Sequence, residues 1–139
     1  MQSKQVLTKD DVKEIAAVSE TEATQNNWRV AISVVDDGGN PLWLQRLDSA
    51  APISAYVAQA KAKSAALGRR ETKGYEDMIN QGRFAFITAP NLEGMLEGGI
   101  PIEVDGQCLG AVGVSGVKLI EGAQIARAGI TAFTETLIK

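Results

Sequence analysis

The chain has 139 residues, of which 45% are hydrophobic, and its formal net charge at neutral pH is −3. A chain of this length predicts one domain, residues 1–139, large enough to bury a core without disulfides or metals. Its acidic balance, with lysines and arginines scattered along the sequence, argues against a nucleic-acid-binding surface.

The first part of the chain predicts a helix followed by a β-hairpin. Apolar side chains recur at helical spacing over residues 9–26, and Thr8 with Asp11 forms a capping box at the start. Residues 29–36 alternate as a strand does, and a glycine-rich turn leads into a second strand at 42–47. The predicted inward face of the first helix consists of Val12, Ile15, Ala16, Ser19 and Ala23.

The rest of the chain predicts three helices, at 53–67, 75–81 and 121–138, a strand at 84–88 and a hairpin over 100–115. For the helix at 53–67 we expect Gly68 as the C-terminal cap. Its expected inward stripe is Ile53, Val57, Ala60, Ser64 and Leu67, and the last helix should bury Ile125, Ala126, Gly129, Ile130, Phe133 and Leu137. Hairpins that follow one another predict an α+β domain with an antiparallel sheet of about five strands.

Two absences restrict location and chemistry. No apolar run approaches the roughly 18 residues that span a bilayer, and the N-terminus lacks the apolar core of a signal peptide. We therefore expect a cytoplasmic protein without membrane contact. The chain has no histidine and a single cysteine, Cys108, which we expect to be an inert core residue. These counts exclude Ser-His-Asp and Cys-His catalysis and the usual zinc sites.

The segment GGIPIEVDGQCLGAVGVSG, residues 98–116, is unusually rich in glycine for a hairpin. Asp105 and Gly106 are typical of a tight two-residue turn. Gly110, Gly113 and Gly116 leave bare backbone on the second strand, which weakens a strand unless something approaches it closely. Either another element packs against this backbone or a ligand does. The glycine spacing is not that of a dinucleotide-binding fingerprint.

Four segments together resemble the GlcG/HbpS-like family of small haem-binding or haem-degrading domains, also found at the C-terminus of the PduO adenosyltransferase. They are a Val-Val-Asp-x-Gly-Gly turn and an Arg-x-Asp in VVDDGGNPLWLQRLDSA, the Lys-Ala pair that begins KAKSAALG, and the glycine-rich hairpin. The resemblance covers nearly the whole chain. It implies a profilin-like fold and assembly into a homo-oligomer, of which an octamer is one option.

The resemblance also implies a site for haem, a related tetrapyrrole or a small anionic ligand at the open end of the sheet. The candidate residues for this site are Asp36, Arg46, Asp48, Lys61, Gly98, Gly99, Pro101 and Ser115. Six of them have a structural alternative: a turn for Asp36, a surface pair for Arg46 and Asp48, a solvated lysine for Lys61, and a flexible strand entry for Gly98 and Gly99. Without histidine, the protein ligands left for haem iron are Tyr56, Tyr75, Met78, Met95, Cys108 or a lysine, unless the iron has none.

Two other functions stay open at this point. A non-catalytic accessory subunit of a metabolic enzyme would need no nucleophile–base pair, and the sequence offers none. An enzyme would have to use Asp36 or Lys61 as an acid–base group with a perturbed pKa. We assign no catalytic residue and no metal ligand, and haem is the one cofactor candidate. The sequence favours a binding protein over an enzyme.

Overall fold

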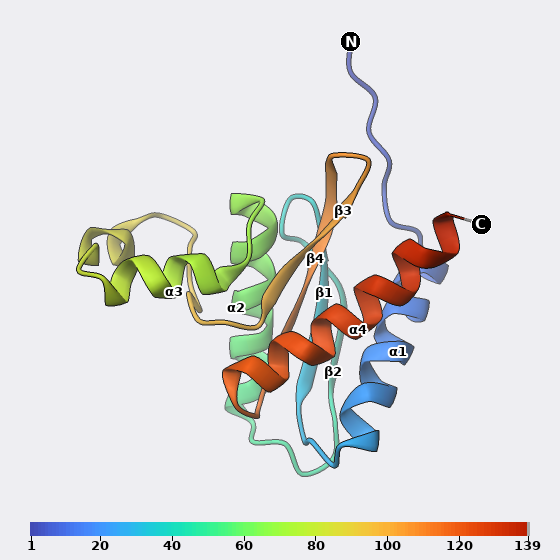
Figure 1. The fold of residues 1–139 in the computed structure, drawn as a ribbon, viewed down its shortest axis with the longest axis horizontal. Coiled ribbons are helices and arrows are strands. Elements are labelled where there is room, and N and C mark those ends of the chain that lie inside the picture. The colour runs from blue at the N-terminus through green and yellow to red at the C-terminus, as the bar shows by residue number, and fades with distance from the viewer. Residues whose placement is uncertain (139) are drawn as a thin grey trace.

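One antiparallel sheet of four strands, in the order β2-β1-β4-β3, organises the fold (Figure 1). The strands are β1 (Ala31–Asp36), β2 (Pro41–Arg46), β3 (Gly99–Val104) and β4 (Gln107–Ser115). The structure is a computed structural model that describes residues 1–138. The α+β class is confirmed, but the sheet has four strands rather than about five.

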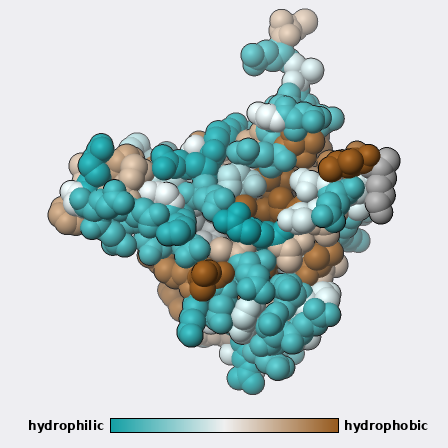
Figure 2. Space-filling view, viewed as in Figure 1, coloured by the Kyte–Doolittle hydropathy of each residue, from teal (hydrophilic) through white to brown (hydrophobic). Residues whose placement is uncertain are grey.

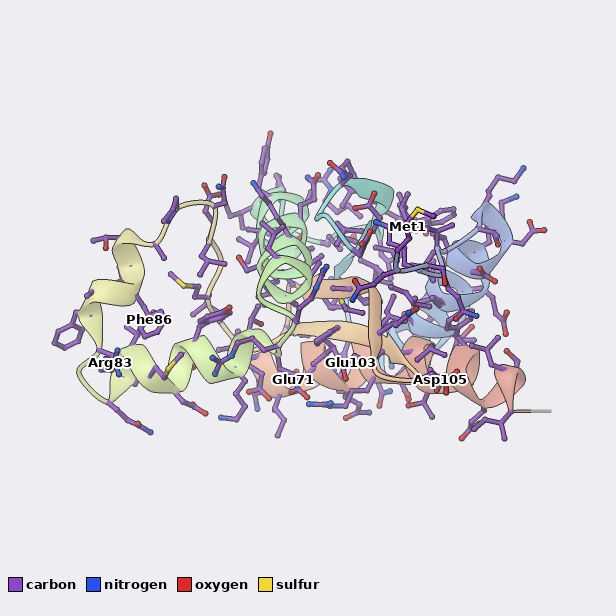
Figure 3. The ribbon with its side chains drawn as sticks, turned by 90° about the horizontal axis from the view of Figure 1, so that it is seen from above. Met1, Glu71, Arg83, Phe86, Glu103 and Asp105 are labelled. Atoms are coloured by element: carbon purple, nitrogen blue, oxygen red, sulfur yellow. The ribbon has the colours of Figure 1, made fainter. Side chains whose placement is uncertain are left out.

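Helices cover both faces of this sheet. α1 (Lys9–Gln25) and α4 (Leu119–Leu137) lie on one face, and α2 (Ile53–Gly68) lies on the other, as Figures 1 and 3 show from two directions. α3 (Thr72–Asn80), the short 3₁₀ helix η1 (Phe84–Thr88) and the loop that follows extend away from the sheet. We call this projection, residues 72–98, the arm.

Local sequence signals explain the first helix and the two hairpin turns. The capping box of α1 is confirmed: the Thr8 hydroxyl accepts from the Asp11 amide at 3.2 Å, and the Thr8 amide donates to the Asp11 carboxylate at 2.8 Å. All five residues of its predicted inward stripe are buried. In the β3–β4 turn, Asp105 and Gly106 have φ of 51° and 78°, the positive values that a tight hairpin turn requires.

The backbone of α2 lies directly on the sheet, which explains the bare backbone of the glycine-rich hairpin. A Cβ at Gly113 would lie 2.5 Å from the amide nitrogen of Ala62 and would overlap the carbonyl oxygen of Ala58. A Cβ at Gly99 would overlap the carbonyl oxygen of Lys61. The residues of α2 that face the sheet are accordingly small. Close packing of a helix, rather than a ligand, is therefore confirmed as the reason for glycine at position 113.

The other two glycines of β4 make room for β1 and the segment before it. A Cβ at Gly110 would overlap the carbonyl oxygen of Val35, and one at Gly116 would lie 2.6 Å from the carbonyl oxygen of Arg29. Both glycines also have positive φ, 159° and 125°. Neighbouring backbone therefore occupies the space at all three positions.

Two sequence predictions about the middle of the chain were wrong. The segment predicted as a strand at 84–88 is the 3₁₀ helix η1, because it packs beside α3 in the arm and never reaches the sheet edge. Of the stripe predicted to face inward from α2, Ser64 is buried and Val57 and Ala60 are half-buried. Ile53 and Leu67 are exposed, at 63% and 39%. The residues that are buried on α2 are Ser54, Ala58, Lys61, Ala62, Ser64, Ala65 and Ala66.

Two smaller expectations about the helix ends also differ from the structure. Gly68 is the last residue of α2, and Arg69 caps the helix in the left-handed conformation. A side chain at position 68 would overlap the hydroxyl of Tyr75, so glycine is needed there for packing. Leu137 was expected to be buried but is 52% exposed, because it lies in the last turn of α4, beyond the sheet contact.

Gly113→Ala should destabilise the protein by about 3 kcal/mol or more, because the new methyl group can be accommodated only if α2 moves off the sheet. The measurement is the urea midpoint of unfolding. Gly38→Ala is the matched control, since a Cβ there would meet only the flexible side chains of Asn40 and Asp36, at 3.2 and 3.5 Å. Equal midpoints for the two variants would contradict the close contact.

Candidate functional site

The structure brings three of the eight candidate residues together, Lys61, Gly98 and Gly99, but it does not gather all eight in one place. Asp36 ends β1 opposite Gly110, whereas Arg46 and Ser115 pair with Ala31 on either side at the other end of β1. Five residues of strand separate Asp36 from Ala31, a distance of roughly 16 Å. Asp36 therefore does not share a site with Arg46 and Ser115.

Asp36 builds the β1–β2 turn. Its carboxylate accepts hydrogen bonds from the amides of Gly38 and Asn40, both at 2.9 Å, and from the side-chain amide of Asn40 at 3.1 Å. These bonds fold the chain back from β1 into β2. The structural alternative for Asp36, a turn residue, is thus the one that the geometry supports.

Arg46 and Asp48 lie two residues apart, at the end of β2 and just beyond it. β2 ends at Arg46, so Asp48 lies beyond the strand and the alternation of strand side chains does not apply to it. Asp48 lines a shallow hollow with Trp28 and Arg29 on the α1 side of the molecule. Both residues are exposed, and no ion pair joins them within residues 1–138. Both side chains are therefore accessible to a ligand at this end of the sheet.

Lys61 is buried, with 2% of its surface exposed. Its ammonium donates to the carbonyl of Val114 at 2.9 Å, and a Cβ at Gly98 would lie only 2.9 Å from the same nitrogen. Burial lowers the pKa of Lys61 to about 8, although the carboxylates of Glu76 and Glu97 oppose the shift. The structural alternative of a solvated lysine is therefore wrong, and Gly98 is bare because this side chain occupies the space.

Hydrogen bonds close the junction around Lys61 and fasten the base of the arm to it. The Thr72 hydroxyl accepts from the Gly99 amide at 2.8 Å, and the Glu76 carboxylate accepts from the Glu97 amide at 2.7 Å. The Ser64 hydroxyl accepts from the Glu93 amide at 2.9 Å and donates to the carbonyl of the same residue. These contacts between distant segments have no sequence signal. They make the surroundings of Lys61 a packed joint rather than an open cavity.

Three hollows on the surface each contain a candidate site residue or a candidate iron ligand. The α2 hollow, of about 480 Å³, lies between the β1–β2 turn and α2. It is lined by Val35, Gly38, Gly39, Asn40, Pro41, Tyr56, Gln59, Ala60, Lys63 and Glu93. The β3 hollow, of about 370 Å³, lies beside β3 and includes Pro101, Arg70 and Arg127. The guanidinium of Arg127 is paired there with Glu71, which Figure 3 places at the base of the arm.

The third is the N-terminal hollow, of about 580 Å³, which contains Cys108. Its side chains are mostly polar, and Lys4 pairs with Asp37 at 2.9 Å, which holds the pKa of that carboxyl below its usual value. Arg69 lines the same hollow. Cys108 is half-buried and its thiol donates to the carbonyl of Gly110 at 3.3 Å. The prediction of a core cysteine is thus wrong, because the N-terminal segment covers Cys108 only in part.

The remaining candidate iron ligands lie in different surroundings. Tyr75 is 5% exposed, beneath the guanidinium of Arg70 at 4.8 Å from its ring centre. Met78 and Met95 are half-buried in the arm. Tyr56, in contrast, is 72% exposed on α2. Within residues 1–138, no cluster of His, Cys, Asp and Glu could hold a metal ion, and no helix has the length and apolarity needed to cross a membrane.

The pH dependence of stability should identify Lys61 as the buried amine. Its pKa of about 8 lies below the ordinary 10.5, so the unfolded chain binds the proton more tightly and the folded protein gains stability as pH rises from 8 to 10.5. The full gain is about 3 kcal/mol. Lys61→Met should remove this rise and be at least as stable as wild type at pH 7, as measured by urea unfolding at pH 7 and 10.

The control for this experiment is Lys63→Met, which changes a half-buried lysine on the same helix. This variant should keep the rise in stability that wild type shows. A rise of the same size in Lys61→Met would contradict the assignment, since another group would then be titrating.

Comparisons with known proteins agree with the fold and give the family. A sequence model of the family described as "Haem degrading protein HbpS-like" matches residues 7–131. Protein GlcG of Escherichia coli K12 is 57% identical over 115 residues, which cover 83% of this chain and 85% of GlcG.

Two solved structures have the same fold. Klebsiella pneumoniae protein ORFY superposes with a TM-score of 0.90 at 31% identity, covering 96% of this chain and 94% of that one. A double mutant of Streptomyces reticuli HbpS superposes with a TM-score of 0.86 at 27% identity, covering 95% and 90%. The chain therefore belongs to the HbpS-like family, and it is similar to GlcG along most of its length.

Proposed function

We propose that this protein binds haem or a related tetrapyrrole. The observation that carries the proposal is the family match, because the description "Haem degrading protein HbpS-like" applies to a model that spans residues 7–131. The alternative of acid–base catalysis by Lys61 has less support, because only 2% of the surface of Lys61 is exposed to a substrate.

The chemistry of the hollows supports the α2 hollow as the haem site. Haem needs apolar contact for its ring, a cation for its propionates and a donor atom for its iron. The α2 hollow offers the exposed Pro41 and the half-buried Ala60 for the ring, and Lys63 and Tyr56 for the other two needs. The N-terminal hollow offers cations and a thiol without an apolar wall. The β3 hollow offers arginines and apolar side chains, but none of the ligands expected for iron.

The candidate residues at the opposite end of the sheet support a separate, smaller site. Arg46, Asp48 and Ser115 are too far from the α2 hollow to contact the same tetrapyrrole ring. The exposed guanidinium of Arg46 suits a small anionic ligand. Binding of a small anionic ligand at this end of the sheet is the second part of the proposed function.

Purified protein should bind haemin with a saturable shift of the Soret band at micromolar concentration. The apolar wall and cation of the α2 hollow would remove the macrocycle from water and hold its carboxylates. The measurement is an absorbance titration, and the controls are buffer without protein and the chain unfolded in urea. A Soret shift that never saturates, or that is equal for the unfolded chain, would contradict haem binding.

We also propose that copies of the chain associate through the arm. Phe84 and Ile87 are 66% and 62% exposed, and both lie in η1, near the far end of the arm, where Figure 3 shows Arg83 and Phe86. Figure 2 shows tan, apolar atoms at this end among the hydrophilic surface of the arm. Large apolar side chains on a projection are typical of a surface that another protein covers.

Replacing both Phe84 and Ile87 with serine should lower the sedimentation coefficient of the wild-type assembly toward that of the 14.7 kDa monomer. The measurement is sedimentation velocity at several concentrations. Val6→Ser, which alters a 64% exposed valine near the N-terminus, is the matched control and should leave the assembly unchanged. A wild-type monomer would contradict self-association, and the exposed arm would then favour the accessory-subunit function.

A further inference from the structure

We propose that Tyr56 is the protein ligand of ferric haem iron in the α2 hollow, with Lys63 pairing with a propionate. This inference rests on the proposed haem binding and names the residues that would hold the group. It concerns a position that the family match does not specify. Ferric iron accepts anionic oxygen, and tyrosine serves as the haem ligand in catalase.

Tyr56 is the one tyrosine whose hydroxyl is open to a ligand. It is 72% exposed, and its hydroxyl forms no hydrogen bond within residues 1–138. Tyr75, the other tyrosine, is 5% exposed and lies under Arg70. A phenol on an exposed helix surface is therefore free to bind a metal centre without breaking an existing contact.

The spacing along α2 places the cation on the same side as the phenol. Lys63 follows Tyr56 by seven residues, which is nearly two full turns and about 10 Å along the helix axis. Ala60 lies between them on the same face and is half-buried, because Gly94 of the arm packs close to its methyl group. Lys63 forms no ion pair within residues 1–138, so its ammonium is available for a carboxylate.

The β1–β2 turn lies beside one end of α2 (Figure 1). Its residues Gly38, Gly39 and Asn40 line the hollow. Gly38 and Gly39 have no side chains there, and a Cβ at Gly39 would lie 3.0 Å from Cγ of Lys63. The turn and the lysine stem thus meet at one end of the hollow. Pro41 is exposed and supplies apolar surface beside the turn, whereas Val35 is 2% exposed and contributes almost none. A planar apolar ring fits such a wall better than a bulky polar ligand does.

The other candidate ligands have poorer surroundings for iron. Lys61 is committed to the carbonyl of Val114 in a closed joint. Cys108 lies in the N-terminal hollow, where the lining side chains are polar or charged and its thiol is bonded to a backbone carbonyl. Cys108 is nevertheless the competing ligand, because thiolates also bind haem iron. The experiment must therefore compare the two positions directly.

The experiment compares Tyr56→Phe with Cys108→Ser and Lys63→Gln, with haemin and iron-free protoporphyrin IX as probes. Tyr56→Phe keeps the aromatic ring and removes the hydroxyl, so it should lower haemin affinity by at least about tenfold, or about 1.4 kcal/mol. It should also abolish the phenolate-to-iron charge-transfer band. Its affinity for protoporphyrin IX, followed by tryptophan fluorescence, should equal that of wild type, because this probe has no iron to ligate.

The remaining variants complete the assignment. Lys63→Gln should weaken both probes, since both carry propionates, and Cys108→Ser should match wild type with either. Haemin binding by Tyr56→Phe with wild-type affinity and spectrum would overturn the role of Tyr56. Loss of binding in Cys108→Ser would overturn it in favour of the thiol. Saturable haemin binding by wild type separates these outcomes from a failure of the proposed function, because its absence would overturn both proposals.

Discussion

The backbone contact between α2 and the sheet is the constraint on which the rest of the structure depends. Gly99 and Gly113 have no side chains at the points where the carbonyl oxygens of Lys61 and Ala58 reach the strands. Because the helix lies so close, its buried face consists mainly of alanine and serine. Most of the large apolar side chains therefore pack on the other face of the sheet, among α1, α4 and the strands.

The same contact explains why a lysine is buried in this fold. Lys61 lies on the α2 face that turns toward β3, so its side chain must run between the helix and the start of that strand. Gly98 leaves room for its ammonium, and the carbonyl of Val114 accepts one hydrogen bond. A buried ammonium with few partners lowers stability at neutral pH. This loss of stability arises at the joint where α2, β4 and the base of the arm meet.

Close packing on one side of α2 also determines what its other side presents. Since alanines fill the sheet contact, Ile53 and Tyr56 remain on the outer surface of the helix, at 63% and 72% exposure. This outer surface borders the β1–β2 turn, whose shape comes from the hydrogen bonds of Asp36. Asp36 thus shapes the α2 hollow through the backbone rather than by contact with a ligand. The proposed haem site is the surface that the helix does not need for folding.

Local patterns in the sequence were sufficient for α1, the two hairpin turns and the α+β class, because capping and turn conformation depend on residues a few positions apart. The four-segment resemblance indicated the family without any structure. Distant contacts decided the rest. The inward face of α2 follows from how near two backbones can approach, and residues 84–88 form η1 because they pack on α3. The burial of Lys61 likewise depends on how α2 meets β4 and the arm, which no local pattern encodes. The separation of Asp36 from Arg46, in contrast, already follows from the β1–β2 turn, since Asp36 adjoins the turn and Arg46 lies at the far end of β2.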